Sequence, residues 1–408
     1  ETGDMLLSRI GDTYHHEEKK EAAEKYYNAA INQYPDSEGA SIAKLRLAKY
    51  SSGVSAYQEV HQKNVNKPIG DLALLEMANR YYEKGVYAMA IENLKGLIRK
   101  PTQVEIHNEA KNLYFRASEQ EIRRLFNDND DGGLIGFYQK AQPPLKKDIE
   151  SEVLLMVADT FLKGKQYEAA ITLYKAIKPF DLKRPLRGRL ILNCARAYRA
   201  AGDDDAAERL IEENIKTEME EKDRQGTTML LAGLNRKKGD LKNAYRLYRS
   251  LVTAKGTVPD ADTARAHLAL GEISNTEKRY EEARVNLRRS IAIAEQDKAA
   301  RPLLTLALVA LGDSYFLENN YDQAAGFYRK GLDEGYGPEE KGYWQTRYRQ
   351  ALSLLELGSI QKAETILREI SEGGDPLLQQ KVQIKLGSLG LKQQLKKLPI
   401  WEEFSGVL

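Results

Sequence analysis

The sequence predicts an all-α fold, an α-α superhelix of stacked helical hairpins, for the 408-residue chain. The first observation is a pattern that recurs every 37 to 41 residues: a small residue, a ring three positions later, a turn that contains Gly, and Ala twelve positions after the small residue. The second is packing, because two antiparallel helices approach closely only where both present Gly or Ala. Since no single hairpin can bury its apolar face, we expect the hairpins to share one core between a concave and a convex surface.

About eight units carry the pattern. The small residue and the later alanine are, in chain order, Gly11 and Ala23, Ala78 and Ala90, Ala158 and Ala170, Ala195 and Ala207, Ala232 and Ala244, Gly271 and Ala283, Gly312 and Ala324, and Ala351 and Ala363. From the third unit onward the small residues are 37, 37, 39, 41 and 39 positions apart. The array is therefore expected to be regular in this part of the chain.

Two earlier intervals between small residues, of 67 and 80 positions, are each close to twice a repeat. They predict degenerate hairpins within residues 41–68 and 104–144, where helix-like sequence lacks the signature. Pro143 and Pro144 mark the expected joint. We therefore expect an irregular region at 1–142, a regular array at 143–374, and capping helices at 375–408 with Leu377, Val382, Leu386 and Leu389 on one apolar side.

The signature positions of the first unit resemble the tetratricopeptide repeat (TPR) family. The matching residues are Gly11, Tyr14, Ala23, Tyr27, Ala30 and Pro35. The resemblance implies a protein that holds a partner protein or peptide in its concave groove. In such arrays the first helix of each hairpin lines the groove through the residues one and four positions after the small residue, and three and six before it.

Five arginines and a neighbouring lysine fall at or beside these groove positions. They are Arg189, Arg196, Arg199, Arg236, Lys237 and Arg265. Because arginine binds carboxylates in a bidentate manner and stacks on rings, this set predicts a site for an acidic or C-terminal peptide. The alternative is that acidic residues of neighbouring helices neutralise the arginines, and Glu272 lies on the same face.

The sequence predicts no catalytic residues, metal site or cofactor. Its five histidines are scattered, and no nucleophile or phosphate-binding motif is present. Asn127, Asn129 and Asp131 resemble the start of a calcium loop, but Tyr138 stands where that loop requires Glu, so a solvated turn is favoured. Cys194, the single cysteine, is predicted to be a buried structural thiol.

Charge and hydropathy bear on location and partner class. A net charge of +2 argues against a nucleic-acid carrier, and the longest nearly apolar stretch, residues 303–311, is too short to span a bilayer. The chain begins with Glu1 and has no signal-peptide pattern, so we expect a processed product or an excised region.

One segment bears on location more directly. Tyr34, Pro35, Ser37, Ala40 and Ala43 resemble a motif of bacterial envelope TPR proteins, which implies the bacterial periplasm or outer-membrane periphery, with the cytoplasm as the alternative. The same residues also fit a structural explanation, in which Pro ends one helix and Ser caps the next.

The predicted function is a non-enzymatic scaffold that binds a partner protein or peptide within a bacterial envelope complex for assembly, secretion or motility. If the arginines form the binding site, the partner is expected to carry an acidic segment. Two alternatives stay open: the helical targeting region of a larger cell-wall enzyme, and a nucleic-acid-binding repeat protein whose binding would fall steeply with salt. Self-association through the repeat ends is also open.

Overall fold

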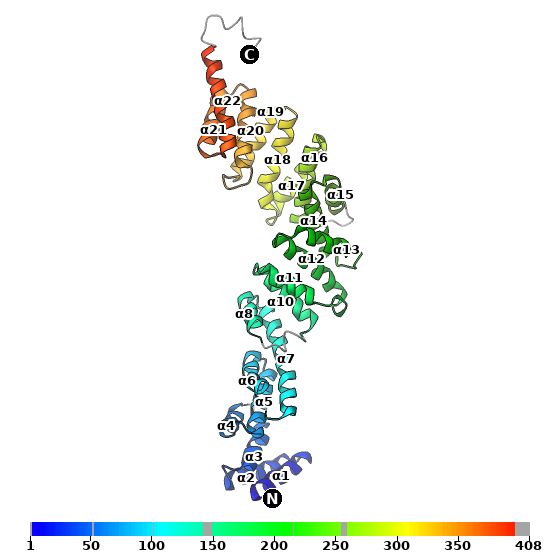
Figure 1. Ribbon diagram of the computed structural model, residues 1–408, viewed down its shortest axis with the longest axis vertical. Helices are drawn as coiled ribbons and strands as arrows, with labels where there is room; N and C mark the ends of the chain where they lie inside the picture. The colour runs from blue at the N-terminus through cyan, green and yellow to red at the C-terminus, as the bar shows by residue number, and fades with distance from the viewer. Residues whose placement is uncertain are drawn as a thin grey trace. The chain divides into compact units, whose positions relative to one another are not determined.

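The computed structural model describes residues 2–50, 53–100, 102–141, 149–214, 216–253 and 259–395. Within these ranges the chain is helical and contains no strand, which confirms the predicted all-α fold (Figure 1). The chain divides into two compact units, Glu1–Met219 and Glu220–Leu408. The predicted joint at Pro143 and Pro144 lies outside the described residues.

Unit 1 is a series of hairpins in which each helix packs on the next. Its helices are α1 (Gly3–His16), α2 (Lys20–Gln33), α3 (Glu38–Ala48), α4 (Ser55–Lys63), α5 (Pro68–Glu83), α6 (Tyr87–Arg99), α7 (Val104–Asn127), α8 (Asp131–Lys140), α10 (Ser151–Lys163), α11 (Tyr167–Ala176), η1 (Pro179–Asp181), α12 (Arg184–Ala200) and α13 (Asp204–Glu213). The pairs α3–α4 and α7–α8 confirm the two degenerate hairpins.

Unit 2 continues with longer and more regular hairpins. Its helices are α14 (Glu221–Lys238), α15 (Leu241–Thr253), α16 (Ala261–Thr276), α17 (Tyr280–Gln296), η2 (Arg301–Leu303), α18 (Leu304–Leu317), α19 (Tyr321–Asp333), α20 (Tyr343–Glu356), α21 (Ile360–Gly373) and α22 (Pro376–Leu395). We call α14, α16, α18 and α20 the first helices of this unit, because each opens a hairpin.

Steric room explains why the small residue recurs. A Cβ atom on Gly11 would lie 2.5 Å from a ring carbon of Tyr27, and one on Gly312 would lie 2.7 Å from a ring carbon of Tyr328. The alanine twelve positions after each small residue is completely buried in all eight units. The two helices of each hairpin therefore meet where the pattern predicts, and no larger residue fits there without a shift of its neighbours.

The interhelix turns require one residue with a positive φ angle. Glycine supplies it at Gly85, Gly202, Gly239 and Gly358, with φ between 73° and 89°. In the other four units the residue at this position is not glycine: Glu18, Lys165, Lys278 and Asn319 have φ between 59° and 61°. Glycine therefore occupies half of these turns and is not obligatory there.

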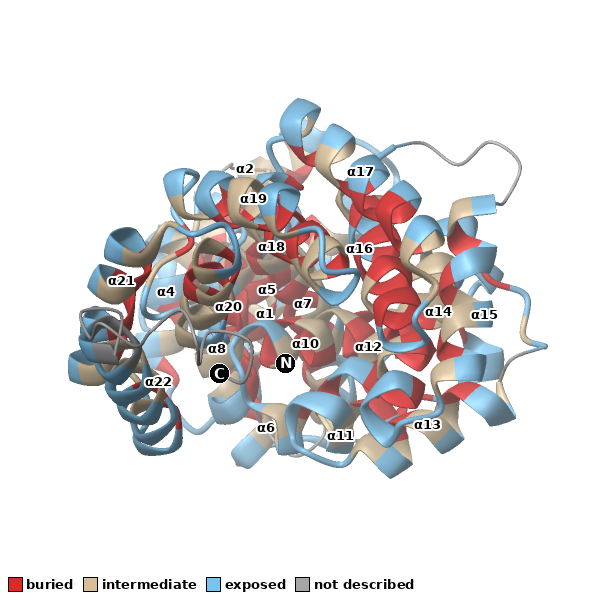
Figure 2. Ribbon diagram, turned by 90° about the horizontal axis from the view of Figure 1, so that it is seen from above, coloured by how far each residue is buried: buried red, intermediate tan, exposed pale blue. Residues whose placement is uncertain are grey.

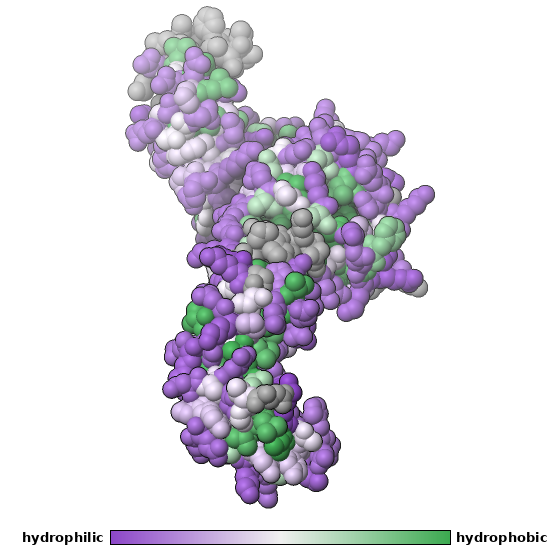
Figure 3. Space-filling model, turned by 60° about the horizontal axis from the view of Figure 1, so that its bottom comes forward, coloured by the Kyte–Doolittle hydropathy of each residue, from purple (hydrophilic) through white to green (hydrophobic). Residues whose placement is uncertain are grey.

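Burial follows the hairpin arrangement throughout. Figure 2 shows buried residues in red on the helix sides that face a neighbouring helix, and exposed residues in pale blue on the outer sides. Hydrophilic side chains cover most of the face seen in Figure 3, with separate apolar patches between them. Each unit therefore has the layered core that stacked hairpins predict.

The expected C-terminal capping region is a single described helix, α22. Leu378 and Val382 are buried on its inner side, and Leu386 packs with them against α20 and α21. The placement of Leu377 on that apolar side was wrong, because Leu377 is 64% exposed. Residues 396–408, which include Pro399 and Trp401, lie outside the described residues.

Candidate functional site

A pocket of about 380 Å³ lies along three successive first helices of unit 2, α16, α18 and α20. Glu272 and Asp313 line it from the positions directly after the small residues Gly271 and Gly312, and Leu306 and Val309 line it from six and three positions before Gly312. These are positions that the sequence pattern assigns to a groove. We call this surface the first-helix pocket.

Both carboxylates of the first-helix pocket are paired with an arginine from a neighbouring first helix. Arg236 on α14 lies 2.7 Å from Glu272, and Arg349 on α20 lies 2.6 Å from Asp313. Burial raises the pKa of Glu272, and the nearby guanidinium of Arg236 opposes that shift. The charged groups of the pocket therefore satisfy one another across the repeats.

Asn275 is the polar side chain of the pocket that is not fully satisfied. It is 8% exposed, and its Nδ2 atom donates a hydrogen bond of 3.0 Å to the carbonyl oxygen of Ala310. Its Oδ1 atom is buried and accepts no hydrogen bond from the described residues. Since a buried acceptor without a donor is costly, this atom offers a bond to a ligand that brings an N–H or O–H group.

A similar contact recurs in three hairpins of the two units. In each, a tyrosine hydroxyl of the second helix donates 2.7 Å to an aspartate that directly follows the small residue of the first helix. A side chain of the next first helix completes the contact 34 or 36 residues after the aspartate. The three sets are Asp12, Tyr27 and Arg46; Asp159, Tyr174 and Asn193; and Asp313, Tyr328 and Arg349.

Three of the basic residues predicted for the groove lie on α12 of unit 1. Arg189 is half-buried, pairs with Asp159 and stacks 5.7 Å from the ring of Phe126. Arg196 donates 3.2 Å to the side-chain oxygen of Asn193. Arg199 is exposed, and within the described part of the chain it forms no ion pair.

The other three lie in unit 2. Arg236 pairs with Glu272, as described above, and Arg265 pairs with Asp262 on its own helix at 2.6 Å. Lys237 is exposed. Arg189, Arg236 and Arg265 therefore each have a carboxylate partner, and for Arg189 and Arg236 that partner lies on a neighbouring helix, as the alternative interpretation expected. That all six serve one binding groove stays a prediction.

Unit 1 has its own pocket of about 380 Å³, along α1, α3 and α5. Met5, Ile42 and Leu72 give it an apolar lining. Ion pairs lie beside this lining, including Lys49 with Glu76 at 3.0 Å. The sequence pattern missed this pocket because α3 and α4 lack the repeat signature.

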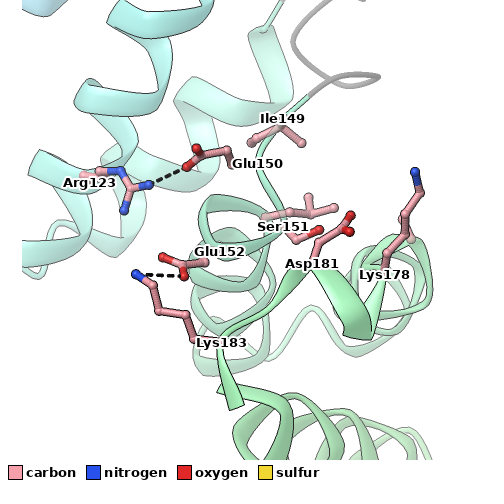
Figure 4. A pocket seen from close by; sticks show the side chains of 10 residues that line it. Arg123, Ile149, Glu150, Ser151, Glu152, Lys178, Asp181 and Lys183 are labelled. Carbon is pink, nitrogen blue, oxygen red and sulfur yellow. Dashed lines mark hydrogen bonds and ion pairs between the residues drawn. The ribbon is translucent and has the colours of Figure 1, made fainter. Parts of the chain in front are cut away.

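A wider pocket of about 860 Å³ lies between the end of α7, the start of α10 and the segment after α11. Figure 4 shows its polar lining, in which Arg123 pairs with Glu150 at 2.7 Å and Lys183 with Glu152 at 3.2 Å. Because these partly exposed charges are already paired, the pocket offers a ligand little net attraction.

The remaining candidates are explained by local structure. Asp130 caps α8 by accepting a hydrogen bond of 2.8 Å from the Gly133 N–H, and Asp131 begins that helix, so the segment is a helix start rather than a calcium loop. Among the described residues no cluster of three or more metal-ligating side chains occurs. Nor does any described helix combine the length and the apolar run that a bilayer crossing requires.

Comparison with known proteins agrees with this architecture. Three family models, each described as a tetratricopeptide repeat, match residues 6–37, 190–225 and 262–333. The chain is a tetratricopeptide repeat protein. Among proteins of curated function, none matches the sequence significantly.

Solved structures of TPR proteins resemble the chain over long stretches. The Cut9–Hcn1 assembly of the APC/C matches over 94% of this chain and 96% of its own, with 11% identity and a TM-score of 0.43. The C-terminal part of a TPR protein from Cytophaga hutchinsonii matches over 64% and 97%, with 13% identity and a TM-score of 0.47. The P58(IPK) TPR domain matches over 88% and 100%, with 17% identity and a TM-score of 0.31. Identities and TM-scores this low say nothing about which partners this chain binds.

Proposed function

We propose that this TPR protein is a non-enzymatic scaffold that binds a segment of a partner protein on the first-helix faces of its hairpin arrays. The observation that carries the proposal is the first-helix pocket of unit 2. Three successive hairpins contribute to it, and it combines apolar side chains with the buried acceptor of Asn275. An extended peptide can supply an apolar side chain to the apolar lining and a backbone N–H group to the acceptor, because its N–H groups and side chains alternate along the chain.

We further propose that an acidic stretch of the partner contacts α12 in unit 1. Arg199 is the strongest candidate contact, since its charge has no partner among the described residues, and Arg196 is the next. Arg189, Arg236 and Arg265 would contribute only if a partner carboxylate replaced the one they already hold. Lys237 adds a cation on α14.

The proposed setting is a bacterial envelope complex. Support comes from the segment that begins at Tyr34, which resembles a motif of envelope TPR proteins. The structural explanation of the motif also holds, since the hydroxyl of Ser37 caps α3 by accepting 3.1 Å from the Ala40 N–H. Fractionation of cells that carry a tagged copy of the natural gene tests the location. Recovery in the cytoplasmic fraction alone would contradict it.

Site-specific photocrosslinking tests the binding face. A photoreactive residue in place of Gln345, which lines the first-helix pocket, should capture the partner from a bacterial envelope extract. The same residue in place of Gln361, exposed on the second helix α21, should capture much less. Equal capture from both positions, or capture from Gln361 alone, would remove the first-helix pocket as the binding face.

The acidic contact has its own test. The double variant Arg196→Glu and Arg199→Glu should weaken the crosslink, because it reverses two groove charges. Arg184→Glu with Arg187→Glu, at the start of the same helix, provides a control with the same change in net charge. If both variants lose the partner equally, the general charge of the chain and not the predicted contact is responsible.

A further inference from the structure

The last described helix, α22, has an apolar stripe on its outer side. Its inner side packs against α20 and α21 through residues that include Leu378 and Val382. On the other side Leu377, Ile384 and Leu391 are 64%, 71% and 57% exposed. Figure 2 shows most of α22 in the pale blue of exposed residues.

The three exposed residues form one line along the helix. They are seven positions apart, so at about 100° per residue they fall within a narrow sector, roughly opposite the buried side. The line is about 21 Å long at 1.5 Å per residue. We call it the outer stripe of α22. Other described helices expose large aliphatic residues singly or, near the start of α6, as the pair Val86 and Met89.

Such a stripe is unexpected at the end of a repeat array. Terminal repeats usually present a polar outer face, because no further repeat covers them. Here α22 packs with α20 and α21, and no described helix lies on its outer side. Large aliphatic residues aligned on such a face, two helical turns apart with Gln380, Lys381, Gly387 and Ser388 between them, indicate an interaction surface.

The charges along the stripe indicate what kind of partner it fits. Between residues 376 and 395 the sequence contains no Asp or Glu. Lys381 and Lys385 lie along one edge of the outer stripe, and neither forms an ion pair with a described residue. The opposite edge is neutral, with Gln380 and Gln383.

Two glycines make room for a helix on the neutral edge. A Cβ atom on Gly387 or Gly390 would have no atom within 4 Å apart from its immediate chain surroundings. Small residues beside an aliphatic row let a second helix approach closely, as the glycines at the hairpin crossings do inside this protein. A membrane surface has no need of such a gap, whereas a packed helix does.

We propose that the outer stripe of α22 is a docking site for an amphipathic helix of a partner protein, with aliphatic residues at heptad spacing and a row of carboxylates along one edge. A second copy of α22 fits poorly, because two lysine rows without acidic residues would repel each other. The site goes beyond the proposed first-helix pocket, which no residue of α22 lines.

A pair of synthetic helical peptides tests the proposal with the full chain. Both carry leucines at heptad spacing; one has glutamates along one edge and the other has lysines there. By fluorescence anisotropy the glutamate peptide should bind in the micromolar range, and the lysine peptide at least about tenfold more weakly. Ile384→Gln should weaken the binding about tenfold, because the peptide can then no longer bury the aliphatic side chain of Ile384, which is largely exposed in the free protein.

Two further variants make the result specific. Leu357→Gln changes another exposed leucine, at the end of α20, and should leave the binding unchanged. Lys381→Glu with Lys385→Glu should reverse the preference between the two peptides. Because all these side chains are at least partly exposed, the helical circular dichroism of each variant should match that of the natural sequence.

Three outcomes of the peptide experiment would overturn the proposal: failure of the full chain to bind the glutamate peptide, equal binding of both peptides, and binding unaffected by Ile384→Gln. If the peptide does not bind but phosphatidylserine vesicles do, and Ile384→Gln abolishes that binding, the stripe is assigned to a membrane surface instead. A dimer in sedimentation that Ile384→Gln dissociates would assign the stripe to a second copy and would also overturn it. Each result leaves the crosslinking test at Gln345 unaffected, so the two proposals can fail separately.

Discussion

The recurrent tyrosine-aspartate contact gives the sharpest test of how the hairpins are joined. Tyr328 is completely buried, and its hydroxyl donates 2.7 Å to Asp313, a carboxylate that Arg349 also holds. Burial raises the pKa of Tyr328, so its hydroxyl remains a donor throughout the neutral range. A hydrogen bond to a charged group contributes about 1.5–3 kcal/mol. Because Asp313 is partly exposed and keeps Arg349, Tyr328→Phe should lower the free energy of unfolding by about 1.5 kcal/mol, near the lower limit.

Asp313→Ala should cost more, about 2–4 kcal/mol, because it leaves the buried hydroxyl without its acceptor and Arg349 without its ion pair. In the double variant the two losses should not add, and the coupling energy should be about 1 kcal/mol or more. Urea unfolding followed by tryptophan fluorescence is a suitable assay, because Trp344, one of the two tryptophans, packs against the core of unit 2.

Tyr321→Phe is the matched control for this cycle. Its hydroxyl bonds to Asn319 at an exposed site, so the change should cost less than about 0.5 kcal/mol. If Tyr328→Phe is equally mild, or if the effects of Tyr328→Phe and Asp313→Ala simply add, the contact does not join the hairpins energetically and the reasoning fails.

Three further predictions follow from buried or shifted groups. Arg284, whose side chain is 6% exposed, pairs with Glu281 and, at 2.6 Å, with Glu318. Arg284→Ala should therefore lower the free energy of unfolding, measured by urea titration, by about 2–4 kcal/mol. A loss below about 0.5 kcal/mol would contradict this. Burial raises the pKa of Cys194 to about 11, so at pH 8 a thiol reagent should react with the native protein at least about a hundredfold more slowly than in urea; rates within tenfold would refute it. Hydrogen bonds from the Thr2 side chain and the Gly39 N–H lower the pKa of Asp4 to about 2. Since this folded-state pKa lies below the unfolded value, ionised Asp4 stabilises the fold above about pH 4, and that stability is lost as the pH falls towards 2. The melting temperature of Asp4→Asn should therefore vary less between pH 4 and pH 2 than that of the natural sequence. Identical melting curves for the two proteins would exclude the effect.

The hairpin architecture could be predicted from the sequence because helix crossing imposes a steric period. Gly or Ala recurs at the position of Gly312, and Ala at that of Ala324, because a larger residue would collide with its neighbours at the crossing. The degenerate hairpins also followed from the double spacing and the helix-like sequence within it, because a hairpin such as α3–α4 fills one repeat. The error at Leu377 has a simple cause: it is five positions from Val382, which places the two side chains about 140° apart around the helix.

The groove was harder to predict, because its charges are satisfied between repeats. Arg236 and Glu272 are 36 residues apart, and Arg349 follows Asp313 by the same interval. A search for opposite charges one repeat apart could have found these pairs. The three-dimensional pocket at Asn275 could not be found in this way, since an unsatisfied acceptor depends on which backbone carbonyl its amide meets.

Pairing between repeats also limits how charge can select a partner. A carboxylate that binds Arg189 or Arg236 must replace Asp159 or Glu272, so one ion pair is exchanged for another with little net gain. The displaced aspartate would also lose part of the contact that joins its hairpin to the next. Affinity must therefore come mainly from groups that the fold leaves available, such as the cation of Arg199, the acceptor of Asn275 and the apolar lining beside it. A partner selected in this way should bind with a weak dependence on salt, because few charges change partners on binding.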